Sequence, residues 1–245
     1  MAARSPQPQP LSRRAELLAG MRGQLPLLVG VAPFGMAYGA YAIESGLSGE
    51  LTQAMSAIVF GGASQFIGVQ LIASGVPGAM IVLATLLVNL RHLLYSASLA
   101  PQVDHLNRRW RWLLAYLLTD EAYAVSMSRL SRDNESPHRH WFVLGAGVAL
   151  WATWQMTTSL GILLGAALPD SWSLDFALPL TFLALLMPVL TSRPAFAAAA
   201  TAGFVAVIGF DWPYGIALVV AIGAGLLAGV ALDRALPGER RRELI

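Results

Sequence analysis

Residues 78–100 read GAMIVLATLLVNLRHLLYSASLA, and residues 110–130 read WRWLLAYLLTDEAYAVSMSRL. Each stretch has the length and apolar content of a helix that crosses a lipid bilayer. Each also carries ionisable side chains near its middle: Arg91 in the first, and Asp120 and Glu121 in the second. A charge at the centre of a membrane helix costs about 2.5–3.5 kcal/mol, so such residues usually face a partner or a water-filled path. These stretches therefore predict a membrane protein, and their ionisable residues indicate where its functional site lies.

The composition of the whole chain also indicates a membrane protein. Of its 245 residues, 56% are hydrophobic and 12% are charged, and the mean hydropathy is +0.59. A soluble domain has about 25% charged residues, so the charged fraction here is far below the soluble range. The sequence thus predicts an all-α, polytopic integral membrane protein in contact with the lipid bilayer.

Several classes of function are excluded by what the sequence lacks. The chain has no cysteine, which rules out disulfides, thiolate metal sites and cysteine nucleophiles. It contains no phosphate-binding loop, no GxSxG and no HExxH motif. All 16 basic residues are Arg, which we attribute to codon usage and not to nucleic-acid binding. We therefore expect no enzyme activity, no cofactor, no metal site and no nucleic-acid partner.

Hydrophobic runs of about 15–23 residues predict eight membrane segments, with six to eight as the range. The segments are expected at residues 24–43, 51–73, 77–99, 110–130, 141–167, 176–190, 194–210 and 214–232. The sixth and seventh are short, which leaves tilted, broken or re-entrant arrangements open. Residues 1–23 are expected to form a disordered cytoplasmic tail, 24–232 a single transmembrane domain, and 233–245 a charged C-terminal tail.

The distribution of Arg predicts that the N-terminus lies in the cytoplasm, because cytoplasmic loops carry an excess of basic residues. Arg108, Arg109 and Arg111 disagree, since eight simple crossings would place them outside. Either this loop breaks the rule, or a segment before it is re-entrant.

Two segments contain residues that interrupt helices. Pro33, followed by Phe34, lies in the middle of the first segment and is expected to kink or break it. Ser64 and Gln65 lie in FGGASQFIG, residues 60–68, where glycines surround them. Transporters use such interrupted helices to bring backbone groups to a substrate site. The alternative is close helix packing by small residues, which we favour for the pairs Gly161/Gly165 and Gly225/Gly229 and leave open for Gly35/Gly39.

Polar side chains in the third segment follow helical spacing. Thr85, Asn89, His92 and Ser96 are predicted to share one face, with Arg91 on a neighbouring face. This would be a polar stripe through the middle of the membrane. The alternative for Asn89 and His92 is that they only satisfy backbone groups.

Asp120 and Glu121 lie near the centre of the fourth segment, and their side chains should point about 100° apart on an ideal helix. Adjacent carboxylates in a low dielectric tend not to ionise together. Arg91 is expected to compensate one of them, which makes the other a candidate proton carrier. The alternative is that an Arg–Asp pair only locks two helices together.

Four strings in this order resemble the AzlC family: PFGMAYG at 33–39, ASQF at 63–66, LLVNLRHLLYSASLAP at 86–101 and LLTDEAYAVS at 117–126. The resemblance covers about residues 20–232, and the strings around NLRH and TDE are the most specific. Ser96 departs from the family pattern, in which many members have Gly.

The resemblance implies the large subunit of a branched-chain amino acid exporter in a bacterial inner membrane. Its expected substrates are Leu, Ile and Val, with Met and analogues as further candidates, and its expected partner is a small hydrophobic membrane subunit of the AzlD type. We expect proton-coupled export. Two alternatives remain: a non-transporting scaffold subunit, and an exporter of another small metabolite.

Overall fold

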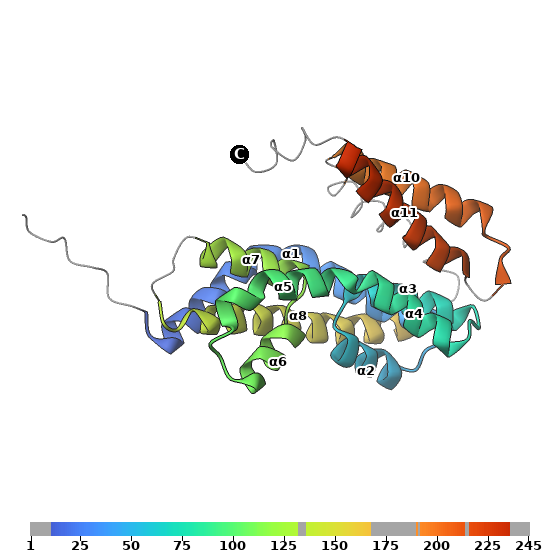
Figure 1. Ribbon diagram of the computed structural model, residues 1–245. Coiled ribbons are helices and arrows are strands. Elements are labelled where there is room, and N and C mark those ends of the chain that lie inside the picture. Colours follow the sequence, from blue (N-terminus) through green and yellow to red (C-terminus); the bar gives the residue numbers. More distant parts are fainter. Residues whose placement is uncertain (1–10, 132–135, 168–189, 191, 214–215, 236–245) are drawn as a thin grey trace, which may run out of the picture.

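The computed structural model describes residues 11–131, 136–167, 190, 192–213 and 216–235. Within these ranges every regular element is a helix, as the sequence predicts (Figure 1). Nearly all of the predicted segment 176–190, and the outer parts of both predicted tails, lie outside the described residues. The helices are α1 Arg13–Glu44, α2 Gly49–Val59, α3 Gly62–Ala73, α4 Gly78–Val88, α5 Leu90–Val103, α6 Arg108–Tyr116, α7 Asp120–Leu130, α8 Arg139–Ala167, α10 Arg193–Ile208 and α11 Ile216–Ala235.

Helices α1 and α8 form the central pair and run parallel in close contact. Gly20 of α1 lies against the carbonyl oxygen of Phe142, and Gly161 of α8 lies against that of Met36. A Cβ at either glycine would overlap the partner backbone, so only glycine permits this approach. The predicted packing role of Gly161 and Gly165 is confirmed, since Gly165 lies equally close to α1.

Helix α1 is longer and more regular than expected. It begins at Arg13, inside the predicted tail, where the Ser12 side chain caps its first turn. It continues through Pro33 to Glu44, so of the kink or break expected at this proline the break is absent. Gly35, two residues later, packs directly on α8. We attribute the unbroken helix to this packing, which offsets the cost of a proline in a helix interior.

Helices α2 and α3 form a hairpin that enters and leaves at the same end of the central pair. Gly49 at the start of α2 lies beside Ile162 of α8, and the end of α2 reaches Gln155, two turns earlier in α8. Helix α3 then runs back, with Gly68 beside Met55. The predicted segment 51–73 is therefore two antiparallel helices and not one crossing.

The reversal between α2 and α3 depends on two residues. Phe60 has a φ of 41°, which makes it the one non-glycine residue with positive φ in the described part of the chain. Gly61 follows in extended conformation as the N-cap of α3. Phe60 is buried, so packing of its ring holds a backbone conformation that a bulky side chain otherwise avoids.

Helices α6 and α7 form a second hairpin from the opposite end. Trp110 at the start of α6 packs on His140 at the start of α8, with 4.9 Å between ring centroids. Leu117, just after α6, reaches Gly147 further along α8. Helix α7 then returns, so that Arg129 lies again at the first turn of α1. The predicted segment 110–130 is therefore also a pair of antiparallel helices.

The tips of the two hairpins are tied together. The Tyr116 hydroxyl, at the end of α6, donates a short hydrogen bond to the carbonyl of Ala57 in α2. The same hydroxyl accepts a hydrogen bond of 2.7 Å from Trp151 Nε1 of α8. The two hairpins thus meet about halfway along α8.

Helices α4 and α5 together run the length of the molecule in the opposite direction to α1 (Figure 1). They are interrupted at Asn89, which ends α4 and precedes α5 with φ −84° and ψ 0°. By length and apolar composition, three stretches of the described chain can cross a membrane: α1, the combined stretch 78–103, and α11. Helix α8 lies beside α1 along most of its length, so the two helices span the same part of the molecule.

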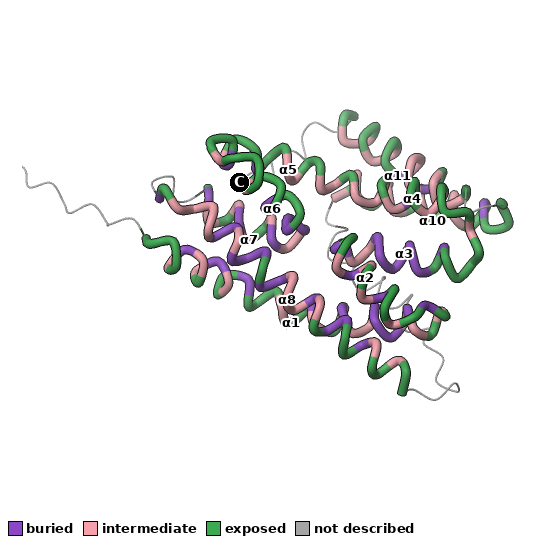
Figure 2. Tube along the Cα trace, turned by 90° about the horizontal axis from the view of Figure 1, so that it is seen from below, coloured by how far each residue is buried: buried purple, intermediate pink, exposed green. Residues whose placement is uncertain are grey.

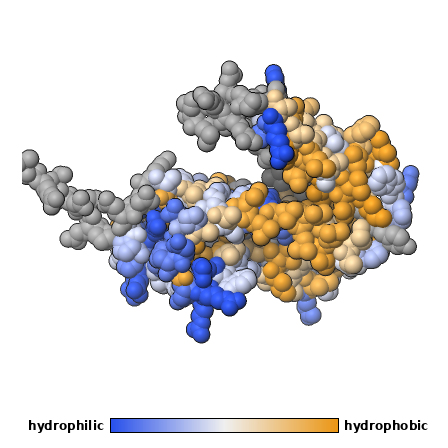
Figure 3. Space-filling view, viewed as in Figure 1, coloured by the Kyte–Doolittle hydropathy of each residue, from blue (hydrophilic) through white to orange (hydrophobic). Residues whose placement is uncertain are grey.

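The two hairpins resolve the conflict in the Arg distribution. Because α2–α3 re-enters, the start of α6 lies at the same end of the molecule as the start of α1. Arg108, Arg109 and Arg111 therefore join Arg13 and Arg139 at one end, here called the basic end, where Figure 3 shows hydrophilic side chains gathered. The α2–α3 hairpin is the arrangement that the re-entrant alternative requires before this loop.

Helices α10 and α11 pack on each other, and α11 contacts α4. Gly225 and Gly229 of α11 lie against Ala198 of α10, which confirms their predicted packing role. Most of the surface of this pair is exposed and apolar, and Phe210 beside it is 85% exposed (Figures 2 and 3). Exposed apolar helices suit contact with lipid or with a hydrophobic partner.

Candidate functional site

The three interruptions meet at one cavity of about 550 Å³. They are the α2–α3 reversal, the α4–α5 break and the α6–α7 reversal, and α1 and α8 complete the walls. The lining residues are Leu27, Gly30, Val31, Phe34, Phe60, Gly61, Gly62, Ala63, Arg91, His92, Thr119, Asp120, Glu121, Leu150 and Trp154. A pocket of this size with mostly apolar walls and a few convergent polar groups is typical of a small-molecule site.

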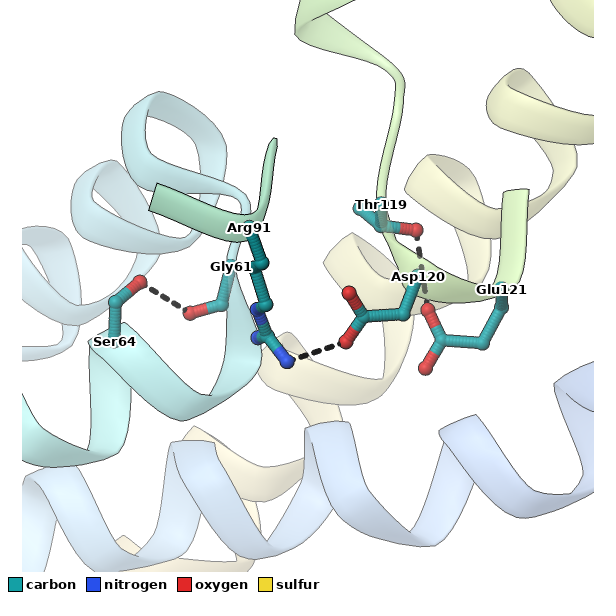
Figure 4. A network of polar contacts seen from close by, with 6 residues as sticks. All are labelled: Gly61, Ser64, Arg91, Thr119, Asp120 and Glu121. Atoms are coloured by element: carbon teal, nitrogen blue, oxygen red, sulfur yellow. Dashed lines mark hydrogen bonds and ion pairs between the residues drawn. The ribbon is translucent and has the colours of Figure 1, made fainter. Parts of the chain in front are cut away.

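An ion pair forms the polar centre of the cavity. Arg91 Nη1, in the first turn of α5, lies 2.6 Å from Asp120 Oδ2, in the first turn of α7 (Figure 4). Their side chains are 34% and 36% exposed, because both border the cavity. Arg91 Nε and Asp120 Oδ1 have no hydrogen-bond partner among the described residues. The pair therefore joins α5 to α7, as expected if it locks two helices together. Arg91 Nε remains available as a donor and Asp120 Oδ1 as an acceptor.

Glu121 lines the same cavity with a different partner. Its Oε2 accepts a hydrogen bond of 3.1 Å from the Thr119 hydroxyl, whereas Asp120 is directed to Arg91 (Figure 4). Ideal helical spacing predicts separate surroundings for the two acids. In the structure both acids lie at the first turn of α7 and line the same cavity, but Asp120 pairs with Arg91 and Glu121 bonds to Thr119. Both benefit from the helix N-terminus, where negative charge is stabilised.

The start of α3 is held by buried hydrogen bonds. Gln65 Oε1 accepts from the Gly61 backbone N–H at 3.2 Å and from Trp154 Nε1 at 3.1 Å. The Ser64 hydroxyl donates to the Gly61 carbonyl at 2.8 Å (Figure 4). Ser64 and Gln65 are fully buried and do not line the cavity, so they support the start of α3 without facing the cavity. The Gln65–Trp154 bond also links α3 to α8, as the packing alternative expects.

Aromatic rings form the apolar wall. Phe34 and Trp154 line the cavity, with 6.2 Å between their ring centroids. Phe66 packs behind Phe34 at 4.9 Å. Pro33 does not line the cavity. It contributes to the site only as part of α1, the helix that carries Phe34.

The predicted polar stripe does not act as one surface, because α4 and α5 are separate helices. His92 lines the cavity, whereas Ser96 lines a groove between α5 and α6. Thr85 donates to the carbonyl of Ile81 in its own helix. Asn89 Oδ1 is buried without a partner among the described residues, so it remains able to accept a hydrogen bond.

Sequence reasoning missed Thr119 and Phe60. Thr119 is the N-cap of α7, and its position directly before two acids is a helix-start signal that the prediction of one continuous span concealed. Phe60 gives no signal beyond the Gly-Gly pair that follows it. Among the described residues, no group of three or more His, Asp or Glu is placed to hold a metal.

These observations describe an all-helical membrane protein with two helical hairpins and a charged cavity where they meet. The chain belongs to the AzlC family: the family model described as AzlC protein matches residues 26–168. This range contains every residue that lines the cavity.

Three relatives illustrate the family. The inner membrane protein YgaZ of Escherichia coli K12 is 30% identical over 189 residues, which cover 75% of this chain and 77% of that protein. An uncharacterized membrane protein of Archaeoglobus fulgidus is 32% identical over 187 residues, covering 75% and 80%. The branched-chain amino acid transport protein AzlC of Bacillus subtilis is 21% identical over 180 residues, covering 71% and 70%. No solved structure matches the chain.

Proposed function

We propose that this protein is a secondary transporter that exports branched-chain amino acids, coupled to protons, across a bacterial inner membrane. The observation that carries the proposal is the cavity in which an Arg–Asp ion pair and a second acid meet three helix interruptions. Membership of the AzlC family and the transport role named for the Bacillus subtilis relative support the substrate class.

The cavity offers a matching group for each part of a zwitterionic amino acid. Arg91 and the N-terminal turn of α3, which has no side-chain cap, suit a carboxylate. Asp120 and Glu121 suit an ammonium group. Phe34 and Trp154 offer apolar surface to an aliphatic side chain. A site that satisfies both charges also favours amino acids over uncharged metabolites.

Ionisable groups in the cavity also suit coupling to protons. Asp120 is paired with Arg91, whereas Glu121 is held by the neutral Thr119. Glu121 is therefore the better proton carrier, because protonating it leaves the ion pair intact.

In this proposal the basic end faces the cytoplasm, following the positive-inside rule. Helices α1, α4–α5 and α8 cross the membrane, and the two hairpins enter it from opposite sides. The exposed apolar surfaces of α10 and α11 offer room for a small hydrophobic subunit of the AzlD type. That partner is proposed from the resemblance to the family.

Reconstitution into proteoliposomes tests the function. We expect flux of isotope-labelled valine and leucine that depends on a pH gradient and is largest with the small subunit present. Flux of a different metabolite would favour the second alternative, an exporter of other cargo. No flux from folded protein, with or without the subunit, would contradict the proposal and favour a scaffold role.

A further inference from the structure

A second group of buried polar side chains lies at the junction of α1, α7 and α8. Glu16 and Gln24 of α1 and Ser126 of α7 are all 0% exposed. The two helices run antiparallel here, since Glu16 lies opposite Arg129 and Gly23 contacts the middle of α7. All three side chains are therefore buried where α1, α7 and α8 pack on one another. None of them belongs to the cavity lining.

These side chains have unused hydrogen-bonding capacity. Both carboxylate oxygens of Glu16, both amide atoms of Gln24 and the hydroxyl of Ser126 have no hydrogen-bond partner among the described residues. Arg129 Nη2 lies 3.6 Å from Glu16 Oε1, which is an ion pair but too long for a hydrogen bond. Buried polar groups in proteins are almost always bonded to protein or to ordered water. Bridging water is the partner that suits donors and acceptors gathered at this junction.

The junction connects the basic end with the cavity. Glu16 is in the first turn of α1, and Arg129 is in the last turn of α7, so both lie at the basic end. At the inner end, Leu27 follows Gln24 by one turn and lines the cavity, and so does Glu121 at the start of α7. Gln24 and Ser126 lie between these two levels. The polar groups thus occupy successive levels between the basic end and the acid that we assign as proton carrier.

We propose that this junction is the path by which a proton passes between the cavity and the basic end, with Glu16 as the protonatable group at its mouth. The inference rests on the proposed proton-coupled transport. The O–H bond of protonated Glu121 breaks, the proton crosses hydrogen-bonded water beside Ser126 and Gln24, and an O–H bond forms on the Glu16 carboxylate. Glu16 then releases the proton to water at the basic end.

The charges around the two acids suit this transfer. Arg129 of α7 faces Glu16, and α8 contributes the Phe142 ring beside this arginine, at 6.0 Å. The charged residues at the start of α8, Arg139 and His140, lie one turn nearer to the basic end, as does Arg13 on α1. Arg129 Nη2 faces the carboxylate of Glu16 at 3.6 Å, an ion pair longer than a hydrogen bond. Glu121 faces Asp120, Arg91 and His92 across the cavity.

The simpler interpretation is that Glu16 and Arg129 only fasten α7 to α1. The two interpretations differ in what Glu16→Gln should change. The test uses the full chain in proteoliposomes, in the subunit composition that carries valine, with a pH-sensitive dye inside. It measures proton movement driven by valine and, separately, valine–valine counterflow at equal pH on both sides.

For Glu16→Gln we expect proton movement to fall by about tenfold or more, because a group that relays the proton is lost. Counterflow should stay at the wild-type level, because the substrate cavity is intact. The matched control is Glu50→Gln, which neutralises an exposed acid in the first turn of α2 and should leave both measurements unchanged. Unchanged proton movement in Glu16→Gln, or an equal loss of proton movement and counterflow, would overturn the path.

Ser126→Ala provides a second test that keeps the fold if Glu16→Gln does not accumulate. It removes one buried hydroxyl with little change in volume, and proton movement should slow severalfold with counterflow retained. Full proton movement in Ser126→Ala would contradict the path. Wild-type protein that carries valine without moving protons would overturn both the path and the proposed proton coupling, while valine export itself would stand. Wild-type protein that carries no valine would contradict the transport proposal itself.

Discussion

At the scale of single residues, the ion pair of Arg91 and Asp120 separates the roles of two neighbouring acids. The pair joins α5 to α7 at 2.6 Å, whereas Glu121 accepts a hydrogen bond from the Thr119 hydroxyl of its own turn. Neutralising Asp120 leaves a cation without its counter-charge, and an unpaired charge inside a membrane is costly. Neutralising Glu121 leaves no such charge. The two acids should therefore respond differently to the same chemical change.

Asp120→Asn is expected to lower the free energy of unfolding by about 1–3 kcal/mol, less than for a fully buried pair because both side chains border the cavity. Valine flux should fall with it. Glu121→Gln should keep near-wild-type stability, because a Gln oxygen still accepts from Thr119, and should lose the pH dependence of flux. Thermal unfolding in detergent and flux at several pH values measure both. Equal, pH-dependent flux in both variants would show that neither acid carries the proton.

At the scale of elements, close helix contact and interrupted helices have different structural roles. Glycines let α1 and α8 approach until backbone touches backbone, which gives the molecule a rigid central pair. The hairpins and the α4–α5 break then bring helix ends to the middle of that pair. Helix ends are where unpaired backbone groups and the helix dipole are available to a ligand. The rigid pair supports the site, and the interruptions form it.

Gly161→Ala and Gly223→Ala make a matched test of this division, since both replace a glycine inside a helix. The first places a Cβ against the Met36 carbonyl and should destabilise the protein by about 1–3 kcal/mol. The second meets nothing within 4 Å and should be neutral or stabilise by about 0.5–1 kcal/mol, because Ala favours the helix. Unfolding midpoints in detergent compare them. A fully stable Gly161→Ala variant would contradict the close approach of α1 and α8.

At the scale of the whole molecule, re-entry changes which loops share a side of the membrane. Eight simple crossings would place Ser74 in the cytoplasm and His105 outside. In the structure the α2–α3 hairpin places His105 at the basic end with Ser12, and Ser74 at the opposite end. The hairpin thus makes the Arg distribution consistent with the positive-inside rule.

Single cysteines at these positions test the topology without background, because the chain has no cysteine of its own. A membrane-impermeant maleimide should label Ser74→Cys in intact cells. It should label His105→Cys and Ser12→Cys only after the cells are permeabilised. The reverse pattern for Ser74→Cys and His105→Cys would favour simple crossings over the hairpins.

The sequence by itself determined the class of protein, the family and the charged residues that line the cavity. Apolar runs of membrane length, and the rarity of charges within them, depend only on composition and spacing, so Arg91, Asp120 and Glu121 could be found without a structure. Packing by Gly161 and Gly225 was also predictable, because small residues repeat at helical spacing.

Only the tertiary structure decided how the segments cross and what each polar residue contacts. A hydrophobic run long enough to cross the bilayer is equally long when it folds back at Phe60 or Leu117, because both forms bury the same apolar residues in the membrane. Glu16 was likewise assigned to a tail, since its burial depends on α7, more than 100 residues later in the chain. Contacts between distant segments have no local sequence signal, and these contacts convert interrupted helices into a cavity.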